Sequence, residues 1–342
     1  MDQIISKFQQ DLLNRLKTCI GSKKLNLELE ELLSISSNSA YKKMNGISPL
    51  SLEEIFIITQ KYQLSVDEFF YSRTSPIPFF SDAIRKMPEH PRDYMLNLTK
   101  YMSQLSQSAE MTYITLAGEV PIFHFMPFKE LFAFKLYAWN FTNWSVKEFE
   151  KKFELKKFLS DEQLQSTINK CAHTFYHFSG IEIWNIRMLD FTVDQIKYFI
   201  QLQAFQTKDH AKTVTNQLFD LLDHLENICI SGTKRFETKE ELNKSSVKIY
   251  MDEIMHSNEI IYVNTNTMDH IFTSIDSPNF IRTSDRRYAN YIKEWLMKSI
   301  SHSSQISGEG MKERTIMIEK MRTKLQRAHD EILMNLDIVY GK

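Results

Sequence analysis

The sequence predicts a mainly α-helical protein in three parts: a short N-terminal helix bundle, a helical middle region and a small α+β C-terminal region. First, the 342 residues include only 8 Gly and 8 Pro, so long stretches contain no helix breaker. Second, apolar residues recur at helical spacing through the first two parts. Third, the chain changes after Lys244 to short β-branched and aromatic segments bounded by Asn and Ser, which is typical of strands.

The net charge, the cysteine content and the hydropathy of the sequence indicate which partners and which cellular compartment to expect. The net charge is −1, so affinity for a polyanion such as nucleic acid must come from a local patch. The 3 cysteines are widely spaced and odd in number, which indicates no disulfide framework and a reducing compartment. No apolar run approaches the roughly 20 residues of a membrane span, and the start MDQIISKFQQDLL lacks a signal peptide's apolar segment. We therefore expect a cytoplasmic protein that contacts no membrane.

The N-terminal part is predicted to begin with two helices and a tight turn. The first helix carries an apolar stripe made by Ile5, Phe8, Leu12 and Leu16. The second is predicted to start at an Asn26 cap and to turn inward Leu29, Leu32 and Leu33. The turn at 34–36 then places Ile35 as an apolar plug and leaves Ser36 to cap the next helix.

The third helix is predicted over residues 37–45, ended by Gly46, and it has two different faces. Ala40 and Met44 lie four apart and pack inward, and the small Ala40 lets the neighbouring helix approach. The opposite face is polar and carries no acidic residue. Asn38 can bind an adenine edge through two hydrogen bonds, and lysines can contact phosphates.

This arrangement is a helix-turn-helix, whose dominant use is to place its second helix in the DNA major groove. The predicted DNA-binding residues are Ser37, Asn38, Ser39, Tyr41, Lys42, Lys43 and Asn45. Two capping boxes, Ser51 to Glu54 and Ser65 to Glu68, are predicted to begin supporting helices.

The motif S-x-S-A-Y-[KR]-[KR]-hydrophobic-N-G at 37–46, followed by PLSLEE at 49–54, resembles the Cro/repressor-like (XRE-type) family of bacterial transcriptional regulators. The motifs PIFHFMPFKELFAFKLYAW, IEIWN and SGEGMKERT carry a wider likeness to regulators with this head and a long uncharacterised C-terminal region. The family usually has Gly at the tight turn after helix two. This chain has Ser34 there, and Ser tolerates a left-handed conformation less well.

Three domains are predicted. Residues 1–75 form the helix-turn-helix DNA-binding domain, ended by SRTSPIP, in which Pro76 and Pro78 cannot continue a helix. Residues 79–240 form an all-helical region, with the clearest helices at 133–144, 163–178, 192–205 and 211–230, the last capped by Gly232. Residues 245–342 form an α+β region with strands near 246–254, 258–265, 271–275 and 279–283, then helices at 288–300 and 311–336.

No catalytic or metal-binding motif stands out. Cys171, His173 and His177 lie close together, and two histidines four apart can share a metal, but the HExxH glutamate is absent and the neighbours are aromatic. Packing histidines are the favoured interpretation. No nucleophile elbow, nucleotide loop or Cys–His pair is found. The sequence therefore predicts no enzyme, no cofactor and no metal.

An effector site in the C-terminal two-thirds is a further prediction. The aromatic stripe from Phe123 to Trp144 is consistent with an apolar ligand pocket or, more commonly, with plain core. Lys and Arg exceed acids between Arg282 and Arg327, which indicates a solvated helix face or an anion-binding surface. Arg286 and Arg287 are the candidate anion or effector contacts, because they follow a predicted strand.

The sequence thus predicts a sequence-specific DNA-binding transcriptional regulator. One helix-turn-helix domain covers half an operator, so we expect a homodimer that binds pseudo-palindromic double-stranded DNA. The C-terminal part would then serve as the dimerisation region and as the sensor of a small-molecule effector. The long final helix is the candidate dimer interface through Ile316, Ile318, Met321, Leu325, Ile332 and Leu333. The alternative is an interaction or sensor protein whose helix-turn-helix mediates protein contacts; an enzyme with a site in 245–305 ranks third.

Overall fold

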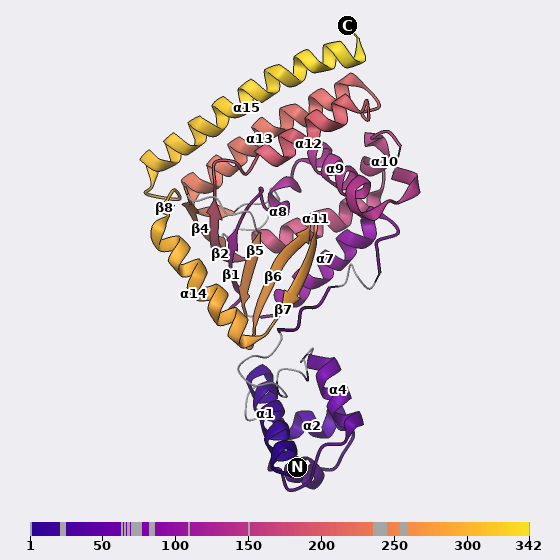
Figure 1. Cartoon of the computed structure of the whole chain (residues 1–342), viewed down its shortest axis with the longest axis vertical. Helices are drawn as coiled ribbons and strands as arrows, with labels where there is room; N and C mark the ends of the chain where they lie inside the picture. Colours follow the sequence, from indigo (N-terminus) through magenta and orange to yellow (C-terminus); the bar gives the residue numbers. More distant parts are fainter. Residues whose placement is uncertain are drawn as a thin grey trace.

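The computed structural model describes residues 2–20, 25–62, 64, 66, 69, 77–81, 86–108, 110–149, 151–234, 245–253 and 259–341. These residues form a small N-terminal head, residues 2–69, and a larger body, residues 86–341. Figure 1 shows the head below the body, with the sheet in the middle of the body and the long C-terminal helix along its upper edge.

The head is a helical bundle. Its helices are α1 (Asp2–Ile20), α2 (Leu25–Leu33), α3 (Ser37–Met44) and α4 (Leu52–Tyr62). They enclose a compact apolar core made by Phe8, Leu12, Leu13, Leu16, Leu25, Leu29, Ala40, Leu50, Ile58 and Leu64. The predicted stripe of the first helix therefore faces this core at the three positions whose side chains are described.

The body contains helices of very different length. They are α7 (Pro91–Leu105), α8 (Ile122–Phe125), α9 (Lys129–Trp139), the π-helix η2 (Asn140–Trp144), the 3₁₀-helix η3 (Lys147–Phe149), α10 (Leu155–Leu159), α11 (Glu162–Tyr176), α12 (Asp190–Gln201), α13 (Lys208–Ser231), α14 (Arg286–His302) and α15 (Met311–Tyr340). Gly232 ends α13 with φ +62°, which confirms the predicted C-cap.

One mixed eight-stranded sheet organises the body. Its strands are β1 (Thr112–Leu116), β2 (Ser179–Trp184), β3 (Thr233–Lys234), β4 (Ser245–Met251), β5 (Ile260–Asn264), β6 (Asp269–Asp276), β7 (Asn279–Thr283) and β8 (Ser304–Gln305). The order is β3-β4-β2-β1-β5-β6-β7, and β8 pairs with β4. β1, β2 and β4 run parallel, whereas β5, β6 and β7 form an antiparallel meander that joins at β1.

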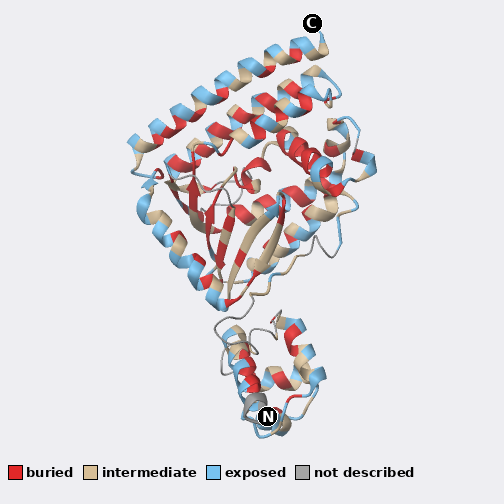
Figure 2. Cartoon of the chain, in the orientation of Figure 1, coloured by how far each residue is buried: buried red, intermediate tan, exposed pale blue. Residues whose placement is uncertain are grey.

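Helices cover both faces of the sheet. On one face α14 packs Ala289, Ile292 and Leu296 against alternate strand residues such as Ile114 and Ile183. On the other face the remaining long helices enclose the main core, in which Tyr113 and Val263 point away from α14. Buried residues accordingly gather where the sheet meets the helices (Figure 2). A sheet covered on both faces has little of the apolar–polar alternation that marks a half-exposed strand.

This architecture shows that the predicted fold class is wrong for the body. Residues 79–240 were predicted to be all helical and the sheet was predicted to be a small C-terminal element. Instead, β1 and β2 lie within 79–240 and pair with β4 and β5, so a single large sheet joins both regions. The strands TYITL and SGIEIW are short and mostly buried, and periodicity does not separate such runs from buried helix.

Other element predictions are confirmed. The predicted strand at 279–283 is β7, and those at 246–254, 258–265 and 271–275 correspond to β4, β5 and β6. The predicted helix at 288–300 lies within α14. The final helix was expected to offer a dimerisation stripe, but Ile318, Met321, Leu325 and Ile332 are buried in the main core of the same chain. They pack there because α15 lies along α12 and α13.

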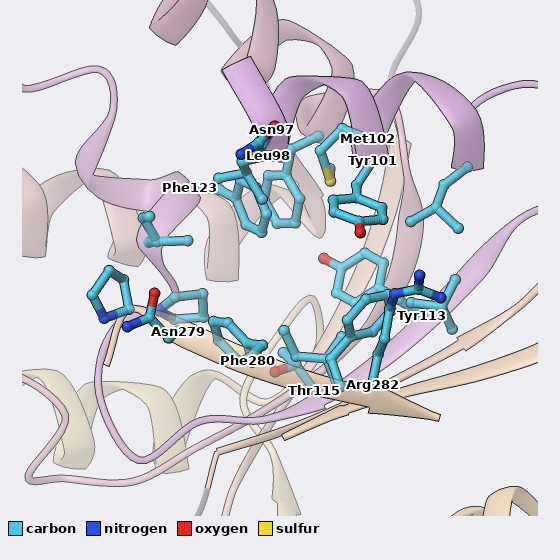
Figure 3. A pocket seen from close by; sticks show the side chains of 18 of the residues that line it. Asn97, Leu98, Tyr101, Met102, Tyr113, Thr115, Phe123, Asn279, Phe280 and Arg282 are labelled. Carbon is cyan, nitrogen blue, oxygen red and sulfur yellow. The ribbon is translucent and has the colours of Figure 1, made fainter. Parts of the chain in front are cut away.

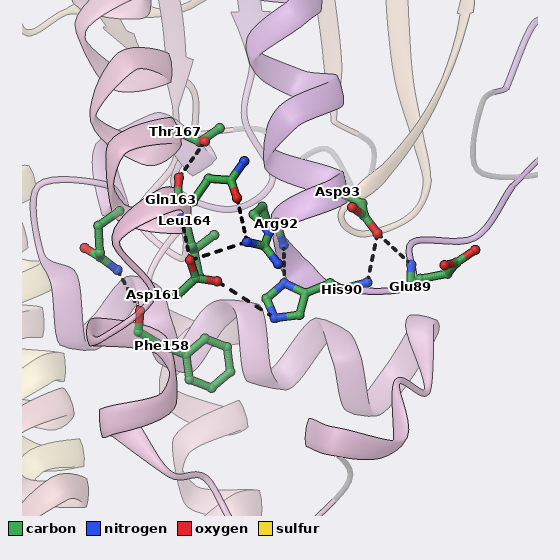
Figure 4. A network of polar contacts seen from close by, with 10 residues as sticks. Glu89, His90, Arg92, Asp93, Phe158, Asp161, Gln163, Leu164 and Thr167 are labelled. Carbon is green, nitrogen blue, oxygen red and sulfur yellow. Dashed lines mark hydrogen bonds and ion pairs between the residues drawn. The ribbon is translucent and has the colours of Figure 1, made fainter.

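Polar contacts join the beginnings of α7 and α11 (Figure 4). His90 Nδ1 accepts from the Arg92 backbone N–H at 3.0 Å, and Asp93 accepts from the His90 backbone N–H at 3.0 Å, which completes a capping box. Arg92 also donates to Gln163 of α11 at 2.7 Å. The Arg92–Gln163 hydrogen bond therefore links the first turn of α7 to the first turn of α11.

Among the residues that the structure describes, no helix combines the length and the apolar character needed to cross a bilayer.

Candidate nucleic-acid interface

The turn and the caps that position α3 are formed as the sequence predicts. Ser34 adopts φ 52°, a left-handed conformation that usually favours Gly. Ser36 Oγ accepts from the Ser39 backbone N–H at 3.3 Å and so caps α3. Gly46 has φ +70° just beyond the helix end. The chain therefore forms the α2–turn–α3 arrangement of a helix-turn-helix.

The outer face of α3 is polar and solvent-exposed. Ala40 on the inner face has 0% exposure, whereas Tyr41 on the outer face has 55%. The exposed positions of the predicted set are Ser37, Asn38, Tyr41, Lys42 and Asn45. Because exposure refers to the whole chain, the described residues of the body do not cover this face.

Asn38 and Lys42 are two of the exposed polar side chains on this face. Within the part of the chain that the structure describes, no hydrogen bond or ion pair engages either side chain. Ser37 instead accepts from Asn26 Nδ2 at 3.0 Å, and Asn45 Nδ2 donates to the Tyr41 backbone carbonyl at 2.9 Å.

Two of the predicted DNA-contact residues are less exposed than the rest. Ser39 and Lys43 are half-buried. Lys43 Nζ donates to the Pro49 carbonyl at 2.9 Å and to Glu54 at 2.8 Å. Burial opposes the charge of Glu54, but its bonds to Lys43 and Ser51 lower its pKa overall. Lys43 therefore connects α3 to α4 within the head.

The supports of α3 include a residue that sequence reasoning missed. Gln9 on α1 is 4% exposed; it donates to the Lys43 and Ser48 carbonyls at 2.7 and 2.9 Å and accepts from the Leu50 N–H at 2.8 Å. A glutamine beside the apolar stripe of α1 was the available signal. These bonds hold the segment after α3 against α1.

Two predicted caps have different outcomes. The box between Ser51 and Glu54 is confirmed, because the Ser51 N–H donates to the Glu54 carboxylate at 2.7 Å and the Glu54 N–H donates to Ser51 Oγ at 3.2 Å. Asn26 is not the cap of α2, because the helix already includes Leu25. The box predicted from Ser65 to Glu68 lies outside the described residues.

The predicted sites of the body are not brought together into one site. Arg287 pairs with Asp285, the cap of α14, at 2.7 Å, and Arg286 is exposed beside it. His177 Nδ1 lies 2.7 Å from the His173 carbonyl in the same helix. Within the described residues, no three His, Cys, Asp or Glu side chains are grouped to hold a metal ion.

The predicted aromatic stripe is mostly core. Its buried members are Phe123, Phe125, Phe132, Phe134, Tyr137, Trp139 and Trp144. Packing within the main core therefore accounts for most of the stripe, while Phe123 also borders a cavity.

Head and body touch at the end of β7. Arg15 of α1 donates to the Ser284 carbonyl at 2.9 Å, and Met268 of the body packs against the head core. α3 takes part in neither contact, so its polar face stays accessible.

Residues 1–96 match the family model of the BetR domain. This domain is associated with regulators of the helix-turn-helix type. The matched residues include the whole head and extend into α7. They therefore pass the domain boundary predicted at residue 75, which lies in a segment, 71–76, outside the described residues. No curated protein and no solved structure matches the chain.

Proposed function

We propose that the protein is a sequence-specific DNA-binding transcriptional regulator of the Cro/repressor-like type that acts in the cytoplasm without enzymatic activity. The observation that carries the proposal is the exposed, acid-free polar face of α3, which is fixed by caps, an ion pair and a buried glutamine beneath it. The match to the BetR domain supports the proposal because that domain is associated with helix-turn-helix regulators.

The side chains on this face suit distinct parts of a duplex. Asn38 has the donor and acceptor that an adenine edge requires in the major groove. Lys42 at the exposed end can neutralise a phosphate, which contributes affinity without sequence information. Tyr41 can contact a thymine methyl group or a phosphate.

The proposed working unit is a homodimer. A single helix-turn-helix covers half of an operator, and two-fold dimers bind half-sites about 34 Å apart on one side of the duplex. The proposed target is therefore a pseudo-palindromic double-stranded operator, with the body providing dimerisation and signal input.

A second candidate is favoured by an apolar surface on the head. Ile47, Leu52 and Phe56 are 66%, 84% and 61% exposed, and Leu52 and Phe56 lie one turn apart on α4. Exposed apolar groups of this kind mark protein contact sites. In this alternative the head binds a protein instead of DNA.

Selection of bound duplexes from a random pool tests the proposal. We expect an enriched two-fold motif, and at least about 100-fold weaker binding of it by the double variant Asn38→Ala with Lys42→Ala, since one good base contact alone contributes about 1–3 kcal/mol. The control is Asn290→Ala with Lys298→Ala, which removes the same side-chain types from exposed positions on α14. Failure to enrich any motif would favour the protein-binding alternative, and full affinity in the double variant would contradict the assigned face.

A further inference from the structure

The body contains a mainly apolar cavity between α7 and the antiparallel half of the sheet. Its volume is about 180 Å³. An engineered cavity of about 150 Å³ holds benzene, so this space accepts a ring or an acyl chain. Figure 3 shows Leu98, Tyr101 and Met102 of α7 on one side and Phe280 and Arg282 of β7 on the other.

The floor of the cavity is one row of residues across four strands. Thr115 of β1 pairs with Ile261 of β5, Ile261 with Phe272 of β6, and Phe272 with Arg282 of β7. Neighbouring strands lie about 4.8 Å apart, so the row spans about 14 Å from Thr115 to Arg282. This is close to the length of an extended decanoyl chain.

Arg282 brings a positive charge to one end of this row. Its guanidinium lies 5.6 Å from the Phe80 ring centroid and 5.4 Å from that of Tyr101. A guanidinium has five N–H donors in a planar fork, which can serve a bound carboxylate besides contacts within the protein. Both ring centroids lie within the cation–π range of this guanidinium, which borders the cavity.

Arg282 also borders a second and more polar cavity of about 460 Å³. The polar residues that line this second cavity include Gln104, Thr265, Thr267 and His270. The two cavities share Tyr101, Leu105, Phe272 and Arg282. Arg282 therefore lies between the mainly apolar cavity and the more polar one.

Among the described residues, one acidic side chain, Glu259, lines the apolar cavity. Burial raises the pKa of Glu259 to about 8, with a further rise caused by Glu119, while Lys135 acts in the opposite direction. The raised pKa reduces the negative charge that Glu259 presents to a ligand anion in this cavity.

We propose that this cavity is the effector site of the regulator proposed above, and that its ligand is a small amphipathic acid. The apolar chain or ring lies along Ile261 and Phe272 beneath α7, and the carboxylate binds the guanidinium of Arg282. This assignment names the chemical class of the effector and replaces Arg286 and Arg287 as its predicted contacts.

The position of the site connects it to the head. Phe80, in the segment between head and body, exchanges backbone hydrogen bonds of 2.8 and 2.9 Å with Arg282. Two residues after Arg282, the Ser284 carbonyl accepts from Arg15 of the head. A carboxylate on Arg282 thus binds within two residues of the Arg15–Ser284 contact between head and body.

Calorimetric titration of the full-length protein with decanoate tests the charge assignment. Decanoate should bind with a negative heat-capacity change, and Arg282→Met should weaken it at least about tenfold, because a hydrogen bond to a charged group contributes about 1.5–3 kcal/mol. Decan-1-ol should bind Arg282→Met and the natural protein equally. Arg286→Met, an exposed arginine four residues away, is the matched control. Equal affinity for decanoate in Arg282→Met would overturn the assignment.

Filling the cavity tests the location. Leu98→Trp and, independently, Ile261→Phe place extra volume in the cavity and should abolish binding, whereas Leu96→Trp on the exposed side of α7 should not. Far-UV circular dichroism shows whether each variant is folded. Decanoate binding that survives in a folded Leu98→Trp or Ile261→Phe protein would overturn the site.

Two further arms complete the experiment. A matching titration with 2-naphthoate shows whether the apolar part of the ligand is a chain or a ring. Binding of either acid supports the proposal. If neither acid binds, the proposal is overturned. Selection of duplexes without any acid is measured in parallel. Duplex binding without acid binding contradicts this inference alone, whereas acid binding without duplex binding contradicts the proposed regulator and leaves the ligand site standing.

Discussion

The head and the body place their polar groups in opposite ways. In the head, the polar side chains of α3 point into solvent above a small apolar core. In the body, a carboxylate, an imidazole and an ammonium are enclosed in the largest core of the protein, at Glu182, His124 and Lys234. The difference agrees with the two proposals made above, in which the open surface binds a long polyanion and the cavity of the body binds a small molecule.

The enclosed network of the body is closely bonded. Glu182 accepts from Tyr113 at 2.7 Å and Trp184 at 2.8 Å, and it lies 3.0 Å from His124 Nε2. Burial opposes its charge, but His124 and then Lys234 lower the pKa of Glu182 to about 2. Burial also lowers the pKa of Lys234 to about 7, against the attraction of Glu182. Tyr113 belongs to both the network and the cavity wall, so this network supports the floor of the proposed ligand site.

Removing the central carboxylate should have the largest effect on stability. Glu182→Gln removes the negative charge that His124 and Lys234 face in this network, and breaking a buried pair in this way costs about 3–5 kcal/mol. Urea unfolding followed by tryptophan fluorescence measures the loss, since all 4 tryptophans lie in the body. Glu294→Gln on the exposed face of α14 is the control. An unchanged midpoint would show that the network does not support the body.

The corresponding test in the head is Gln9→Leu. It removes three hydrogen bonds and leaves the Lys43 and Ser48 carbonyls and the Leu50 N–H without this partner, for a cost of about 2–3 kcal/mol in the head. Gln10→Leu, at an exposed neighbouring position, should change little. Hydrogen exchange resolved by residue separates head from body; equal protection in both variants would refute the support role.

Acid should act mainly on the body. Burial lowers the pKa of His224 to about 3 and, together with Arg282, that of His270 to about 4, from 6.5. Below pH 6.5 the unfolded chain binds more protons than the folded one, so stability falls as pH drops from about 6.5 toward these folded values. His224→Gln should flatten the dependence of the urea midpoint on pH between 6.5 and 4. The same slope in variant and natural protein would contradict this cause.

The smallest predicted change is a gain in the head. Ser34→Gly relieves a left-handed conformation and should stabilise the head by about 1 kcal/mol. Ser36→Ala, two residues away, should cost a similar amount because it removes the cap of α3. The melting temperature of the Ser34→Gly protein should therefore rise and that of the Ser36→Ala protein should fall. Shifts of the same sign in the two variants would contradict the assigned roles.

The head could be predicted because its signals are local. Ser36, Gly46 and the Ser51–Glu54 box act within four residues of where they stand, so the sequence shows them directly. Gln9 was missed because its partners lie 34 to 41 residues away. The same limit applies more strongly to the body, where β2 pairs with β4 more than sixty residues later.

The cavity shows why a candidate site could be only partly predicted. The strand carrying Arg282 was predicted correctly, and the basic character of the following segment drew attention to Arg286 and Arg287. Only the register across β1, β5, β6 and β7 places Arg282 beside Phe272 on the cavity floor. Arg287 is instead held by Asp285 at the start of α14. Charge density in the sequence locates a region, whereas strand pairing decides which side chain faces inward.

In the proposed function, α3 contacts duplex DNA through base and phosphate together. The most direct measurement is the salt dependence of affinity for the selected duplex, with Lys42→Met and Asn38→Ala measured separately. Lys42→Met should reduce the slope of log K against log salt by about 1, and Asn38→Ala should relax the preference at one base pair with the slope unchanged. Identical slopes and identical base preferences in both variants and the natural protein would contradict the claim.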